Sequence, residues 1–281
     1  MKSTSKLAVI LSVLLASSGA MAADWASNSI GYRYAPSGSE PGVSDKVSKN
    51  IATFTHVSGD SLGSNFFTID LLKSASNDPA AGTGNTKGAQ EWYGFYQRNF
   101  SLSALTGNKT GYGYAKDLNL TARIDAGTKN TTFAPAPLKL RLGVAAVMPV
   151  SAGFWNIGIE AYKETNNNSI AFPGKVPGSV SFTVAPAFTT AWAIPVGGLG
   201  TFGGFADVIG PKGKDGFGQQ TKTETLARAT FMFNVMGPKS GLTAGVGVEY
   251  WNNKFGCDNS LSTVKNSCRS TTPLLLVEYK L

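Results

Sequence analysis

Side chains that commonly perform catalysis are few in this sequence. The only histidine is His56, in the segment "FTHVSG", and Asp70 is its nearest plausible carboxylate partner on the following segment. A serine or cysteine nucleophile usually needs a histidine beside it, yet no G-x-S-x-G motif occurs. The run "GGLGTFGG" over 197–204 lacks the Lys-Ser/Thr that ends a phosphate-binding loop. We therefore expect no enzyme and no cofactor, with His56 a hydrogen-bonded residue of the wall.

The two cysteines, Cys257 and Cys268, lie close together in sequence near the C-terminus. A zinc site would need two further ligands, and His56 is far away along the chain. In an exported protein, paired thiols are oxidised during export. We expect a disulfide that closes a loop of about a dozen residues, worth roughly 3 kcal/mol in the chain-entropy model.

Charged side chains recur at every second position of many segments. In "DLNLTARIDA", Asp117, Arg123 and Asp125 alternate with apolar residues. The charges predicted to share one polar face are Arg33, Asp70, Glu91, Asp117, Arg123, Asp125, Lys139, Arg141, Glu160, Asp207, Arg228, Glu249, Glu278 and Lys280. Both signs are mixed, which favours ion pairs across strands; a ring of one sign would instead indicate strong ion selectivity.

Aromatic rings are assigned to the same polar face. They are Phe54, Phe66, Tyr93, Phe95, Tyr162 and Phe205. Rings in a watery lumen can stack on a flat solute, and stacking on a nucleic-acid base is worth about 1–3 kcal/mol. The alternative is that they pack against loops folded into the lumen, and the sequence leaves both open.

The elements that would position these residues are β-strands. In "LTAGVGVEYW", the apolar residues from Leu242 to Tyr250 alternate with Thr243, two glycines, Glu249 and Trp251. This period of two predicts strands with one apolar and one polar or small face. Twelve such segments occur, near 27–35, 49–58, 64–74, 89–100, 113–126, 137–148, 153–164, 179–194, 201–210, 223–236, 242–253 and 272–281.

Short and long connections alternate between these segments. Short turns such as "PVSAG" and "GPKSG" alternate with long segments rich in Gly, Ser, Asn, Asp and Pro; the long "SLSALTGNKTGY" is the exception. An even strand number with short turns at one end is typical of an outer-membrane β-barrel. The expected fold is all-β: one twelve-stranded antiparallel transmembrane barrel with short periplasmic turns and longer surface loops. A soluble β-sandwich also alternates, but the long strands and the aromatic ends of the apolar faces disfavour it.

The N-terminus has the pattern of a secretory signal. Lys2 and Lys6 precede the apolar run "LAVILSVLLA", and Ala20-Met21-Ala22 fits a cleavage site; an uncleaved anchor is the alternative. We assign 1–22 to the signal peptide and 23–281 to the barrel. Without Lys2 and Lys6 the chain has 23 basic and 17 acidic residues, a formal charge of +6. The basic residues are dispersed, so the sequence lacks the cluster of Lys and Arg that is typical of nucleic-acid binding.

Several segments resemble the nucleoside-specific channel-forming outer-membrane proteins (the Tsx family), within a subgroup described as outer envelope proteins. They are "SIGYRYAPSGSEPG", "FSLSALTG", "WAIPVGGLGTFGGFADV", "VEYWNN" and "LLLVEYKL". The resemblance implies a monomeric twelve-stranded barrel with a narrow channel for nucleosides. It also implies that Tyr34, supported by Arg33, lies where the family passes its solute.

The sequence thus predicts a channel in the outer membrane of a Gram-negative bacterium, in contact with lipid and selective for small solutes, nucleosides first. Twelve strands lie between the filled eight-stranded barrel and the wide porins, which suits a narrow conduit. A general or differently specific porin is the second hypothesis, and a non-conducting surface barrel is the third.

Overall fold

The computed structural model describes residues 23–281 except 83, 85, 177, 238 and 262–265, so the predicted signal peptide lies outside the described residues. The strands are β1 (Trp25–Gly38), β2 (Val47–Asp60), β3 (Gly63–Ser74), β4 (Gln90–Ser101), β5 (Asp117–Lys129), β6 (Ala136–Val147), β7 (Phe154–Asn167), β8 (Ser179–Ser181), β9 (Ala185–Val196), β10 (Gly200–Ile209), β11 (Glu224–Asn234), β12 (Leu242–Asn252) and β13 (Arg269–Lys280). Helical turns are formed by α2 (Leu102–Thr106) and η1 (Lys254–Gly256).

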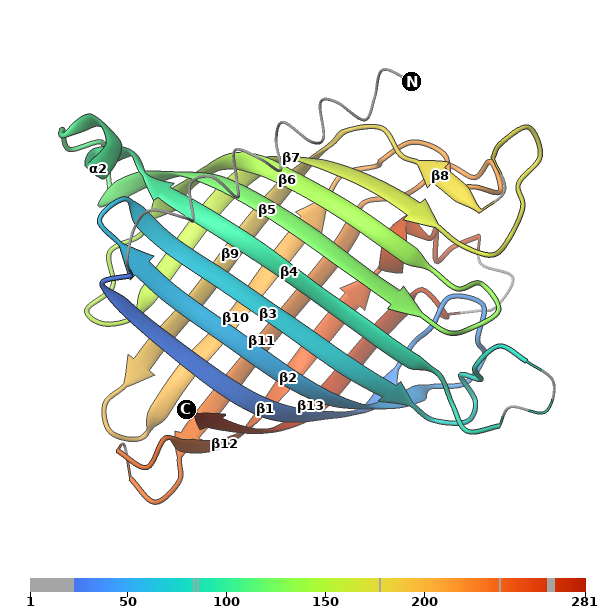
Figure 1. Cartoon of the computed structure of the whole chain (residues 1–281), viewed down its shortest axis with the longest axis horizontal. Coiled ribbons are helices and arrows are strands. Elements are labelled where there is room, and N and C mark those ends of the chain that lie inside the picture. The colour runs from blue at the N-terminus through green and yellow to red at the C-terminus, as the bar shows by residue number, and fades with distance from the viewer. Residues whose placement is uncertain (1–22, 83, 85, 177, 238, 262–265) are drawn as a thin grey trace.

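Twelve of these strands close into a barrel. From β1 to β7 each strand pairs antiparallel with the next, β7 then pairs with β9, and pairing continues in order to β13. β13 closes the ring by pairing with β1. β8 is a short addition that pairs with the end of β7. Figure 1 shows the strands crossing the molecule obliquely, with the turns and loops at its two ends. The predicted all-β, twelve-stranded fold is confirmed.

Side chains alternate between the lumen and the outer face. On β12, Val246 is 53% exposed and its partner on β13, Leu275, is 59% exposed. Glu249, three residues from Val246, points the other way and pairs with lumenal Arg228. An apolar stripe faces outward on strand after strand, which is the pattern required of a barrel surrounded by lipid. Glu249 therefore stands between two outward-facing residues in sequence, while its carboxylate lies on the lumenal side.

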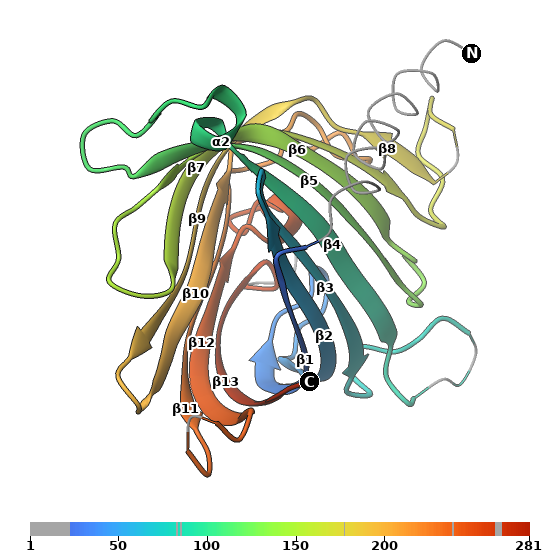
Figure 2. The same cartoon turned by 60° about the vertical axis from the view of Figure 1, so that its left-hand side comes forward.

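The two ends of the barrel differ in their connections. The described residues of the turns over 61–62, 148–153, 197–199 and 235–241 lie at one end, called here the short-turn end. The first residues of β1 and the last residues of β13 lie at the same end. The described residues of the loops over 39–46, 75–89, 130–135, 168–178, 210–223 and 253–268 lie at the other, the long-loop end. The exception predicted after the fourth strand is real: α2 and residues 107–116 extend from the rim between β4 and β5 (Figure 2).

One predicted strand is interrupted. The sequence indicates a single strand over 179–194, whereas the structure divides it into β8 and β9 with a break at 182–184. Val180 and Phe182 do not face lipid; they are buried against Phe172 in an apolar cluster of the long-loop end. β8 still pairs with β7, but its register is shifted by one residue relative to that of β9, and such a shift exchanges the two faces of a strand.

Candidate channel lumen

Most of the predicted channel residues face the lumen. The strand registers place Arg33, Phe66, Asp70, Glu91, Phe95, Arg123, Arg141, Glu160, Tyr162, Phe205, Asp207, Arg228 and Glu249 on one continuous inner face. Directly paired residues of adjacent strands point to the same side of a sheet. For example, Tyr93 pairs with Asp70 on β3 and Phe205 pairs with Arg228 on β11. Any contact of these residues with a solute stays a prediction.

Three predicted lumenal residues instead face outward, and their assignment to the lumen is wrong. Tyr34 pairs with exposed Leu275 on β13. Phe54 pairs with exposed Ile30, and His56 lies on the same face of β2 two residues later. β2 carries apolar side chains on both faces, because Ile51 packs inside the barrel. The alternation therefore does not fix its phase, and an error of one residue exchanges the two faces.

His56 and Asp70 do not form a pair. The Nδ1 atom of His56 lies 2.7 Å from the side-chain oxygen of Asn28 on the outer face. Asp70 lies inside, where its carboxylate accepts hydrogen bonds from Arg33 and Thr53. Among the described residues, no group of three or more His, Cys, Asp or Glu side chains is arranged to hold a metal ion.

The middle of the lumen is lined by ion pairs. Arg33 donates to Asp70 at 2.7 Å, and Arg228 contacts the Glu249 carboxylate at 2.5 Å. On the opposite wall, Arg123 binds Asp125 at 2.7 Å. Each of these arginines therefore has a carboxylate partner, and the wall presents both signs of charge rather than a ring of one sign.

Arg141 makes the most enclosed of these contacts. Its side chain is 3% exposed and lies 2.6 Å from Glu160 and 2.9 Å from Asp207. Arg141 is on β6 and Asp207 is on β10, so the pair connects strands that are not neighbours in the sheet. The side chains therefore reach across the lumen and fill part of its cross-section.

Aromatic rings lie beside these charges. Phe66 and Phe95 stack with their centroids 5.3 Å apart and an angle of 18° between their planes. The Arg123 guanidinium carbon lies 3.6 Å from the centre of the Phe95 ring, and that of Arg228 lies 5.2 Å from the centre of Phe205. The stack on β3 and β4 presents flat apolar surface within the charged part of the lumen.

The short-turn half of the lumen carries small side chains. Its inward positions include Gly31, Gly143, Ala145, Gly158, Ala191, Ala193, Gly203, Gly245 and Gly247. The ion pairs of Arg33, Arg123, Arg141 and Arg228 lie further toward the middle of the barrel.

Sequence reasoning missed the groups that close the long-loop end. Glu40, from loop 39–46, binds Lys49 at 2.7 Å, Lys254 at 2.9 Å and Lys129 at 3.0 Å. Burial alone would raise the pKa of the Glu40 carboxyl, but the three ammonium groups hold its pKa well below the ordinary value. Strand periodicity does not extend into loops, so it contains no signal for Glu40.

A second loop is held in the same way with the charges reversed. Lys212, from loop 210–223, is 2% exposed. Its ammonium group lies 2.5 Å from Glu164 on β7 and 4.0 Å from Glu224 on β11. The same group lies 4.6 Å from the centre of the Phe182 ring, an arrangement typical of a cation–π contact. Both loops are thus fixed to the barrel wall by buried charges.

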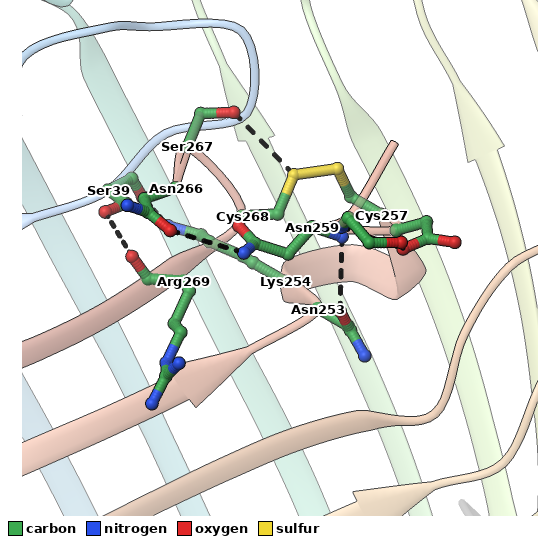
Figure 3. Close-up of a disulfide and its surroundings, with 11 residues drawn as sticks. Ser39, Asn253, Lys254, Cys257, Asn259, Asn266, Ser267, Cys268 and Arg269 are labelled. Carbon is green, nitrogen blue, oxygen red and sulfur yellow. Dashed lines mark hydrogen bonds between the residues drawn. A yellow bond between two sulfur atoms is a disulfide. The ribbon is translucent and has the colours of Figure 1, made fainter. Parts of the chain in front are cut away.

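Cys257 and Cys268 form a disulfide within the last long loop, with their Cα atoms 6.0 Å apart (Figure 3). The backbone at both cysteines contacts Lys254: its amide donates to the Cys268 carbonyl at 2.9 Å, and the Cys257 amide donates to its carbonyl at 3.1 Å. The disulfide therefore fixes the segment that presents Lys254 to Glu40.

Within the described part of the chain, no helix is both long enough and apolar enough to cross a membrane. No family model matches the chain, and no curated protein sequence matches it.

The chain is similar in architecture to several solved barrels. The translocator domain of autotransporter NalP from Neisseria meningitidis is 12% identical with a TM-score of 0.48, covering 99% of this chain and 97% of that one. The β domain of the Bordetella autotransporter BrkA is 8% identical with a TM-score of 0.40, covering 92% and 99%. OccK5 from Pseudomonas aeruginosa is 11% identical with a TM-score of 0.31, covering 91% and 97%. At these values the likenesses add nothing to the strand pairing, on which the barrel assignment rests.

Proposed function

We propose that this chain is an outer-membrane channel of a Gram-negative bacterium that admits small uncharged polar solutes, with nucleosides the leading class. The observation that carries the proposal is the lumen, where four arginines are paired with carboxylates and aromatic rings lie beside them. The outward apolar band supports a position in lipid. The resemblance to the Tsx family supports nucleosides within the solute class and a monomeric barrel.

Charge pairing favours an uncharged solute. Arg33, Arg123, Arg141 and Arg228 each contact a carboxylate, so the charge of these four arginines is compensated and attracts an anion less strongly than a free guanidinium would. The pairs still offer donors and acceptors to polar groups.

The stacked rings favour a solute with a flat face. Phe66 and Phe95 form a stacked pair of lumenal rings, and stacking of a base on such a ring is worth about 1–3 kcal/mol. A solute that combines a flat ring with hydroxyl groups would use both the stack and the polar pairs. Nucleosides have this combination, whereas sugars lack the flat ring and nucleotides add charge.

Conductance of the purified protein in a planar lipid bilayer tests the proposal. Adenosine and uridine should reduce the ion current at lower concentrations than glucose or AMP. Phe66→Ala should weaken the block by adenosine roughly 5- to 140-fold, the range that corresponds to the loss of one stacking contact. Phe67→Ala is the matched control, because Phe67 neighbours Phe66 but pairs with His56 on the outer face. Equal block by adenosine and glucose would instead support a general porin.

A non-conducting barrel is the second candidate function, because Glu40 bridges the walls at the long-loop end. Absence of current from correctly folded protein in the same bilayer would favour it. A protein mass in detergent equal to that of one chain would support the monomer that the resemblance implies.

A further inference from the structure

Loop 39–46 is anchored at the long-loop end by more than one residue. The Glu40 side chain is nearly inaccessible, with 6% of the residue exposed. The Ser39 hydroxyl donates to the Arg269 carbonyl at 2.7 Å, and Lys254 donates to the Ser39 carbonyl at 2.9 Å (Figure 3). Lys46 donates to the Ser39 hydroxyl at 2.5 Å. The loop is thus held at both its ends and is not a free surface segment.

The lysines that bind Glu40 come from opposite sides of the ring. Lys129 lies at the end of β5, and Lys254 follows β12. The order β5-β4-β3-β2-β1-β13-β12 separates them by the same number of strands as the order β5-β6-β7-β9-β10-β11-β12. One carboxylate at 3.0 Å from Lys129 and 2.9 Å from Lys254 therefore connects opposite walls. Figure 2 shows the loop after β1 in light blue.

The cluster around Glu40 is balanced in charge. Lys129 also binds Asp78 at 2.6 Å, and Lys49 also binds Glu91 at 2.9 Å. Three lysines thus meet three carboxylates in a buried site. Removing one carboxylate leaves an uncompensated buried cation, which is strongly unfavourable. The lysines would then separate or admit water, and the connection between the walls would be lost.

We infer that Glu40 determines the size of solute that enters this barrel, because it fastens loop 39–46 across the long-loop end. The part of this inference that concerns solute entry rests on the proposed channel function. The fastening of the loop does not, and it has a separate measurement. Larger solutes are excluded while Glu40 connects Lys129 and Lys254, and smaller ones pass beside the loop.

Two readouts on Glu40→Gln test the inference, with Asp45→Asn as the matched control. Asp45 is an exposed carboxylate of the same loop, so its variant removes one charge without touching the cluster. A spin label on Ser44→Cys, which is exposed, reports loop motion without requiring conduction. The native cysteines are joined in the disulfide and do not compete for the label. Polyethylene glycols of graded size, added to the bilayer, report the largest solute that enters.

Glu40→Gln should sharpen the spin-label spectrum and shift the exclusion limit to larger polymers, while Asp45→Asn changes neither. A mobile loop with an unchanged exclusion limit in a conducting barrel would overturn the role of Glu40 in solute size. An unchanged spectrum would overturn the fastening itself. If the loop becomes mobile in Glu40→Gln but neither protein conducts, the inference that Glu40 fastens the loop stands. The proposed channel is then rejected, and with it the role of Glu40 in solute size. If Glu40→Gln does not fold, Lys254→Gln breaks the connection from one wall and should give the same two shifts.

Discussion

The assignment of faces predicts a large difference between two arginine substitutions at the same depth. Val246 is close to the middle of β12, and its side chain lies outside between Phe231 and Leu275. An arginine on the lipid face of a barrel costs about 2–4 kcal/mol at the bilayer midplane. Val246→Arg should therefore lower the folding equilibrium constant roughly 30- to 700-fold.

The control is Thr230→Arg on the neighbouring strand. Thr230 pairs with Gly247 on β12 and with Gly203 on β10, so it lies at the same depth but faces the lumen. The two paired glycines carry no side chain, which leaves room for a longer residue. An arginine there remains among water and polar groups, and its cost should be small.

Folding of both variants into lipid vesicles can be followed by the change of gel mobility on heating and by urea titration. We expect Val246→Arg to unfold at lower urea concentration than the parent protein and Thr230→Arg to remain close to it. Equal destabilisation by the two substitutions, or a larger effect of Thr230→Arg, would refute the assignment of faces.

Three further predictions concern the lumen and the long-loop end. Arg141→Leu should destabilise the barrel by about 3–5 kcal/mol in urea titration, because it leaves Glu160 and Asp207 without their buried partner; no change would show that water already screens the pair. The pKa of Glu40 is depressed, so its stabilising effect should be complete above the ordinary glutamate pKa and be lost only as pH falls through the lower value. Spin-label spectra of loop 39–46 should therefore be constant from neutral pH down to the ordinary glutamate pKa and sharpen below it; sharpening near neutrality would contradict the ion pairs. Reduction of the Cys257–Cys268 disulfide should raise protease cleavage of the last loop and the mobility of loop 39–46, since the backbone of Lys254 is hydrogen-bonded to both cysteines. The gel mobility of the barrel should stay unchanged. Unaltered cleavage would reject this role of the disulfide.

The sequence by itself determined the class of fold and most of the inner face. A barrel in lipid must place apolar residues outside and polar ones inside on every strand. Each strand therefore alternates apolar and polar residues in its own sequence, with a period of two. The segment predicted over 242–253 corresponds to Leu242–Asn252 in the structure. Glu249 and Arg228 could be assigned to the lumen because each alternates with apolar residues that face lipid.

The same local pattern could not decide the phase of β2. Ile51 contributes to an apolar cluster inside the barrel, while Phe54 lies outside, so both faces of the strand resemble each other. The register with β1 and β3 decides which face of β2 lies in the lumen and which faces outward, since directly paired residues must share a face. His56 and Phe54 were misplaced for this reason.

Only the tertiary structure decided what lies at the long-loop end. Glu40, Lys129 and Lys254 are far apart in sequence and belong to no common pattern, and two of them stand in loops. They meet because closing the ring places β5 opposite β12 and leaves a buried site where unpaired charges would be costly. Periodicity describes one strand and its immediate surroundings, whereas the Glu40 cluster depends on the circumference of the whole barrel.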